Sequence, residues 1–115
     1  MDFDNLKRKL AEFADARDWQ RFHSPKNLSM ALAAEAGELL ELFQWLTEAQ
    51  SAGPDATLRR EIAHELADIL IYTVRLADRL DIDLDAAVAE KMQINADKYP
   101  VALARGNATK YNRRD

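Results

Sequence analysis

The sequence predicts an all-α protein, a bundle of four main helices in a single domain spanning residues 1–115. A chain of 115 residues is long enough for one hydrophobic core and too short for a second folding unit. Only three Gly and three Pro are present, and this scarcity of turn residues favours long helices over many short strands. Apolar residues also recur every three or four positions along most of the chain.

The first helix is expected over Asp2–Arg17, where large apolar residues recur at helical spacing. These residues are Phe3, Leu6, Leu10 and Phe13. An irregular link is expected over Asp18–His23. Ser24 and Pro25 then predict a helix start, because Ser can cap the first turn and Pro fits a position whose N–H has no helical partner.

The second helix is expected to run to about Leu46 and to end before the turn residues Gly53 and Pro54. Its apolar stripe comprises Leu28, Leu32, Ala36, Leu39, Phe43 and Leu46. The third helix is expected from after Asp55 to about Leu80. Its stripe comprises Ile62, Leu66, Ile69, Thr73, Leu76 and Leu80.

Asp83 predicts the cap of a fourth helix over Leu84–Lys98, which the Tyr99-Pro100 pair should end. The remaining tail is expected to be irregular and is rich in Lys and Arg. This basic tail is either a solvated chain end or a set of cations that folds over an anionic ligand.

Composition excludes several classes of function. The chain has no Cys, which rules out disulfide scaffolds, thiolate catalysis and zinc ribbons. Its net charge of −4 argues against binding to a nucleic acid polymer, which needs a basic face. The longest strongly apolar run, near Ile69–Val74, is far short of the ~20 residues of a membrane span. Met1–Phe13 lacks an apolar signal region, so we expect a cytoplasmic protein without membrane contact.

Two pairs of acids stand three residues apart on the two longest predicted helices. Glu35 and Glu38 form the first pair, and Glu65 and Asp68 form the second. Residues at this spacing share one side of a helix, and both pairs flank the apolar stripe of their helix. Carboxylates beside a core are costly unless they are paired or bind a cation. Two facing helices would thus offer four oxygen ligands to a hard ion such as Mg²⁺. The alternative is that these acids are ordinary surface residues without a ligand.

Aromatic residues follow the acids on the same helices. Trp45 comes seven residues after Glu38, and Tyr72 comes seven residues after Glu65. Seven residues are about two turns, or roughly 10 Å, which is about the distance between the phosphates and the base of a nucleotide. The predicted link adds Trp19, Phe22 and His23. The pattern fits a site in which aromatic rings hold a nucleotide base while Mg²⁺ holds its phosphates. The alternative is that these aromatic residues are simply large core or interface residues.

The spacing Glu35-x-x-Glu38 and Glu65-x-x-Asp68 resembles the metal-binding signature of the all-α NTP pyrophosphatase superfamily, the MazG-like proteins. The surrounding stretches resemble its dCTP pyrophosphatase branch, over the chain from Phe13 to Tyr111. These stretches are Arg17 to His23, Pro25 to Leu28, Glu41 to Trp45, Asp68 to Tyr72, Lys91 to Asn95 and Lys98 to Pro100.

The resemblance implies a MazG-like helical bundle that assembles as a homodimer or homotetramer, with sites built across subunits. It implies that the four acids bind Mg²⁺ and act in catalysis. It also implies a substrate-binding set, with Trp19, Trp45 and Tyr72 around the base and His23 close by. The set is completed by residues that meet the phosphates or the sugar, which are Lys91, Asn95 and Tyr99.

Two positions depart from the pattern of the branch. Leu10 stands where a His is expected in the base pocket of animal relatives, which puts an identical base preference in doubt. His64 precedes Glu65 at a position where an acid is common, so an auxiliary carboxylate is missing there.

The predicted activity is Mg²⁺-dependent hydrolysis of a nucleoside triphosphate, dCTP or a modified dCTP, to the monophosphate and pyrophosphate. No Ser–His or Cys–His arrangement offers a covalent route, so we expect direct attack of water, oriented by Glu35 or Glu38. The alternatives are the same fold acting on dUTP or a non-standard purine nucleotide, and a non-catalytic helical module that binds a partner protein.

Overall fold

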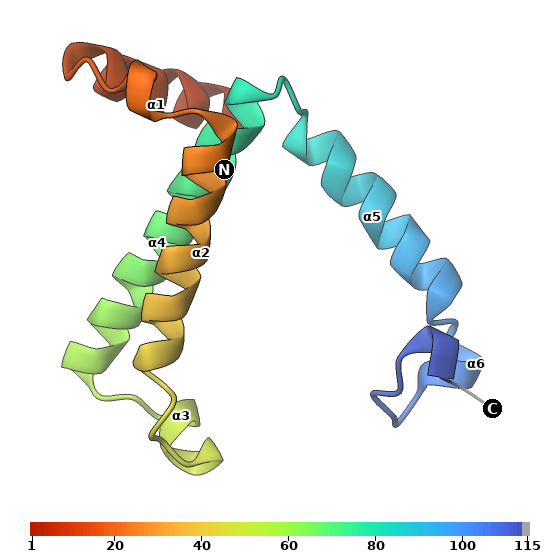
Figure 1. Ribbon diagram of the computed structural model, residues 1–115. Helices are drawn as coiled ribbons and strands as arrows, with labels where there is room; N and C mark the ends of the chain where they lie inside the picture. Colours follow the sequence, from red (N-terminus) through yellow and green to blue (C-terminus); the bar gives the residue numbers. More distant parts are fainter. Residues whose placement is uncertain (114–115) are drawn as a thin grey trace. The chain divides into compact units, whose positions relative to one another are not determined.

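The computed structural model describes residues 1–113, and within them every regular element is helical (Figure 1). The chain divides into two compact units, residues 1–82 and residues 83–115. The expected all-α class is therefore confirmed. Arg114, the last cation of the basic tail, lies outside the described residues.

Helix α1 spans Phe3–Ala16, and the side chain of Asp2 caps it by accepting from the amide of Asn5 (3.0 Å). The chain reverses after this helix at Asp18, whose φ of 54° lies in the left-handed region that Asp tolerates better than most residues. The amide of Trp19 then donates back to the carbonyl of Ala14 (2.8 Å). This closure leads into the 3₁₀ turn η1, Gln20–Phe22, within the predicted link.

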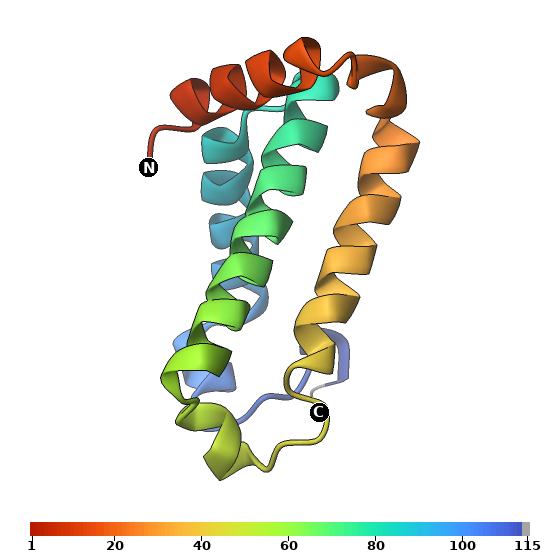
Figure 2. The same ribbon diagram turned by 90° about the vertical axis from the view of Figure 1, so that its left-hand side faces the viewer.

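Helix α2 spans Pro25–Glu41, and α4 spans Ala56–Arg79. The start of α2 is as predicted: Ser24 Oγ accepts from the amide of Asn27 (3.2 Å), and Pro25 occupies the first helical position. The two helices lie side by side and run in opposite directions, and α1 lies across the end where α2 begins and α4 ends (Figure 2).

The buried apolar core of residues 1–82 lies where these three helices meet. Its members are Ala14 from α1, Leu28 from α2, and Val74 and Ala77 from α4. Burial of these side chains supplies the apolar driving force that holds α1 and α2 on α4. The link between α1 and α2 lies beside the last turns of α4, where His23 and Gln20 accept hydrogen bonds from Arg75.

The second helix ends at Glu41, earlier than the predicted Leu46, and a short helix α3, Glu48–Ala52, follows. Thr47 starts α3 through a capping box. Its hydroxyl accepts from the Gln50 amide (3.1 Å), and its own amide donates to Gln50 Oε1 (2.9 Å). The apolar stripe through Phe43 and Leu46 suggested a longer helix, but the capping box at Thr47 starts a separate one.

Residues 83–113 carry helix α5, Leu84–Lys98, capped by Asp83, which accepts from the amide of Ala86 (3.1 Å). Two short elements follow, α6 (Val101–Ala104) and η2 (Tyr111–Arg113), so the tail is less irregular than predicted. The ring of Tyr111 lies edge-on to that of Tyr99, with centroids 6.1 Å apart. Within residues 1–113, no helix is long and apolar enough to cross a membrane.

Candidate active site

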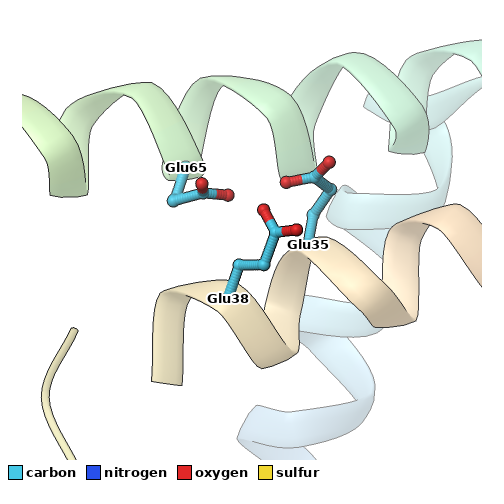
Figure 3. A group of neighbouring side chains, drawn as sticks. All are labelled: Glu35, Glu38 and Glu65. Atoms are coloured by element: carbon cyan, nitrogen blue, oxygen red, sulfur yellow. The ribbon is translucent and has the colours of Figure 1, made fainter. Parts of the chain in front are cut away.

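Three glutamates meet between α2 and α4. Glu35 and Glu38 project from α2 toward Glu65 on α4 (Figure 3). One carboxylate oxygen from each residue lies within 4.8 Å of the other two. Three negative charges at this separation repel one another, and a bound cation would remove that repulsion. The i, i+3 spacing on α2 and the antiparallel packing of α4 together create this group, which we call the carboxylate group.

The oxygens of the carboxylate group are poorly satisfied by the protein. Glu35 Oε2 and Glu65 Oε2 are buried, and within residues 1–113 no donor group supplies them with a hydrogen bond. The pKa of Glu35 is raised from 4.5 to about 7, chiefly because its protonated form can hydrogen-bond to Glu65, and further by burial and by Glu38. A buried carboxylate oxygen without a donor is unfavourable. A hard divalent cation is the ligand that satisfies such oxygens.

Asp68, the fourth predicted acid, stands one turn beyond Glu65 on α4. Among the described residues it is not part of the close group; it lines an adjoining pocket of about 390 Å³. This pocket is bounded by α1, by the link and by the second half of α4. Its lining residues are Leu10, Phe13, Trp19, His23, Asp68, Ile71, Tyr72 and Arg75.

Aromatic rings form one wall of the pocket. Phe13 and Trp19 meet edge to face with centroids 5.8 Å apart, and Trp19 meets His23 in the same manner at 6.2 Å. The chain reversal at Asp18 makes this possible, because it places the link against the end of α1. A mainly apolar cavity with a few polar groups is the usual form of a site for a flat organic ligand.

Electrostatics set the protonation of two groups in the pocket. Burial raises the pKa of Tyr72 above its usual value, and the charges of Glu35 and Asp68 raise it further, so the phenol stays neutral. Burial also lowers the pKa of His23, together with the nearby charges of Arg75 and Arg79. His23 is therefore a neutral imidazole at physiological pH.

The predicted site residues outside the carboxylate group fall into three locations. Trp19, His23, Asp68 and Tyr72 line the pocket, next to the carboxylate group. The structure places Trp45 in the turn after α2 with 87% of its surface exposed, and not in the pocket wall. The other three belong to residues 83–113. Lys91 and Asn95 share one side of α5, and Tyr99 caps its end.

Sequence reasoning missed the most buried charged residue of the described chain, Arg75, which is only 3% exposed and lines the pocket. One signal was available. Arg75 interrupts the most apolar stretch of α4, and a charge inside such a stretch is costly unless it is paired. Leu10, which the resemblance placed where a His is expected in the base pocket of animal relatives, lines this pocket.

The helices and the site define an all-helical protein with a candidate divalent metal centre beside an aromatic pocket. The model of the MazG-like family matches residues 30–113, which is more than half of the chain. The chain therefore belongs to the MazG-like family.

Characterised relatives and a solved structure agree with this assignment. The chain is 50% identical over 111 residues to dCTP pyrophosphatase 1 of Rattus norvegicus and to that of Homo sapiens. Each match covers 94% of the chain but only 65% of the relative's length. The crystal structure of a pyrophosphatase from Archaeoglobus fulgidus is similar with a TM-score of 0.75 and 38% identity, over 84% of this chain and 91% of that one.

Proposed function

We propose that this chain is a Mg²⁺-dependent nucleoside triphosphate pyrophosphatase that hydrolyses dCTP or a modified dCTP to the monophosphate and pyrophosphate. The observation that carries the proposal is the carboxylate group of Glu35, Glu38 and Glu65 beside a pocket with an aromatic wall. The 50% identity to relatives named dCTP pyrophosphatase 1 favours this substrate, although the chain spans only 65% of their length.

The residues present fit Mg²⁺. Carboxylate oxygens are the ligands it prefers, and the donor-free oxygens of Glu35 and Glu65 are available to it. Glu35, Glu38, Glu65 and Asp68 would hold the ion. When bound, it would neutralise charge on the phosphates during transfer.

The chain's own acids then position the nucleophile. Glu35 or Glu38 orients a water molecule toward the α-phosphorus and takes up its proton. Attack of this water breaks the bond to the bridging oxygen, and the products are the nucleoside monophosphate and pyrophosphate. Since the chain has no Cys, and no hydroxyl side chain is among the lining residues other than that of Tyr72, direct hydrolysis is the simplest route.

The pocket supplies the binding energy for the base. Trp19 and Tyr72 offer ring faces and edges for stacking, and His23 offers a polar contact. We further propose that Trp45 completes the base site and that Lys91, Asn95 and Tyr99 contact the phosphates or the sugar. Because Trp45 is largely exposed, a second copy of the chain would cover it in a homodimer or homotetramer. We expect this assembly to work in the cytoplasm.

Incubation with the common and several modified nucleoside triphosphates, with Mg²⁺ or with EDTA, tests the proposal. We expect monophosphate and pyrophosphate with Mg²⁺ only, and fastest turnover for dCTP or a modified form of it. If another nucleotide is cleaved fastest, the proposed reaction stands and the proposed substrate is wrong. Leu10, which lines the pocket, would then be the first residue to substitute in a study of base preference. No cleavage of any nucleotide would refute the proposal and favour a non-catalytic helical module.

A further inference from the structure

Arg75 joins the pocket to the link between α1 and α2. It is the only buried charged side chain among residues 1–113. Its Nε donates to His23 Nδ1 (3.2 Å), and its Nη2 donates to Gln20 Oε1. Its Nη1 donates to Asp78 Oδ2 (3.2 Å), which balances the buried charge. Two of these three partners belong to the link, which lies 52 or more residues earlier in the sequence.

The bond to His23 determines where its imidazole carries the proton. A guanidinium has only donor groups and no acceptor. Nδ1 of His23 must therefore accept, and the proton of the neutral ring must be on Nε2. A histidine without such a partner populates both tautomers.

The remaining contacts hold the ring in place. Gln20, the second residue bonded to Arg75, also donates from Nε2 to the carbonyl of Ala11 (3.5 Å), which ties the link to α1. The ring of Trp19 packs on that of His23. The imidazole is thus fixed by a buried ion-paired arginine on one side and an aromatic ring on another.

We propose that Arg75 is a positioning residue that holds His23 as the Nε2–H tautomer, so that the imidazole presents an oriented hydrogen-bond donor to an acceptor atom of the nucleobase. The inference rests on the proposed function. The pocket wall is mainly apolar and aromatic, and stacking on it accepts any base. A donor that is left unpaired in such a pocket penalises a base without a matching acceptor, so the Arg75–His23 pair is a determinant of base selection.

The position of the proton can be read without any substrate. Long-range ¹H–¹⁵N NMR of the ligand-free protein at pH 8 reports which ring nitrogen is protonated, and a His64→Gln variant assigns the other of the two histidines. We expect the wild type to show Nε2–H alone and Arg75→Met to show both tautomers. Arg79→Gln is the matched control, because it removes a nearby charge from the same helix and should leave the tautomer unchanged. A proton on Nδ1 in the wild type, or an unchanged Arg75→Met spectrum, would overturn the proposal.

A second pair of variants tests the donor itself and does not depend on how well Arg75→Met folds. The amide N–H of Gln reaches the position of Nε2, whereas the amide of Asn reaches only that of Nδ1. We expect His23→Asn to have a KM for dCTP about tenfold above that of His23→Gln, with similar kcat, as for loss of one hydrogen bond. Equal KM values would overturn the proposal. If the wild type cleaves no nucleotide, the proposed function fails, and the NMR result alone supports or overturns the role of Arg75.

Discussion

At the scale of single residues, the close approach of Glu35, Glu38 and Glu65 couples the protonation of Glu35 to the stability of the fold and to the metal binding that we propose. In the metal-free protein, Glu35 keeps its proton up to a pH of about 7, because Glu65 can share it and because burial disfavours the charge. A divalent ion requires the ionised form, so proton and metal compete for this group.

This competition predicts opposite pH trends with and without metal. In EDTA, the contribution of Glu35 to stability is full below pH 4.5 and falls as pH rises to about 7, because only the folded form still binds the proton in that range. Stabilisation by Mg²⁺ should instead grow from pH 5 to pH 8. Thermal unfolding across this range measures both trends. Glu35→Gln should remove both, and a variant that keeps them would contradict this role for Glu35.

In the proposed enzyme, replacing Glu65 with Gln should reduce turnover of dCTP by at least about a hundredfold, since a neutral amide cannot replace the carboxylate that we propose as a ligand of Mg²⁺. The fold should persist, because the change keeps the shape of the side chain. Steady-state kinetics with circular dichroism check both points. Glu61→Gln is the matched control: this exposed acid lies one turn earlier on α4, and its variant should retain activity. Full activity of the Glu65 variant would refute the site.

At the scale of elements, the helix starts follow from local capping. Ser24, Thr47, Asp55 and Asp83 each accept a hydrogen bond from an amide three residues later. Such bonds form within one turn and need no tertiary contact, so the starts of α2, α4 and α5 could be predicted from sequence. The same local capping starts α3, which was not predicted from the sequence. Thr47 and Gln50 form its capping box, and this residue pair can be recognised in the sequence.

Asp55 offers a test of this local control. Its carboxylate accepts from the amide of Leu58 (2.8 Å) at the start of α4, the helix that carries Glu65 and Asp68. Asp55→Ala should destabilise the fold by about 1 kcal/mol, which corresponds to a fall in Tm of about 4 °C. KM for dCTP should not change, because the residue lies more than two turns from Glu65. Thr57→Ala, a change at an exposed residue in the first turn of α4, serves as the control, and an equal fall in its Tm would argue against the cap.

At the scale of the whole molecule, large apolar side chains remain uncovered within residues 1–82. Trp45 is 87% exposed and Leu40 is 62% exposed, and both come from α2 or the turn after it. Exposed apolar surface of this kind is typical of interaction surfaces, and we propose that another copy of the chain covers it.

We therefore expect sedimentation equilibrium to give a multiple of the 13.1 kDa chain mass. Leu40→Glu, which places a charge on the apolar surface of α2, should shift the equilibrium toward the monomer. Ser29→Glu adds the same charge at an exposed polar position of the same helix and should leave the assembly intact. A monomeric wild type would refute the proposed assembly.

The sequence by itself determined the starts of the four main helices and the candidate metal ligands. Helical periodicity and caps act over three or four residues, and the pairs Glu35 with Glu38 and Glu65 with Asp68 have the same range. Only the tertiary structure decided which of these side chains meet. The antiparallel contact of α2 with α4 brings Glu65 to the two acids of α2, while Asp68 lines the pocket instead. The bond from Arg75 to His23 joins residues 52 apart, and such pairs depend on how helices pack, which no local pattern encodes.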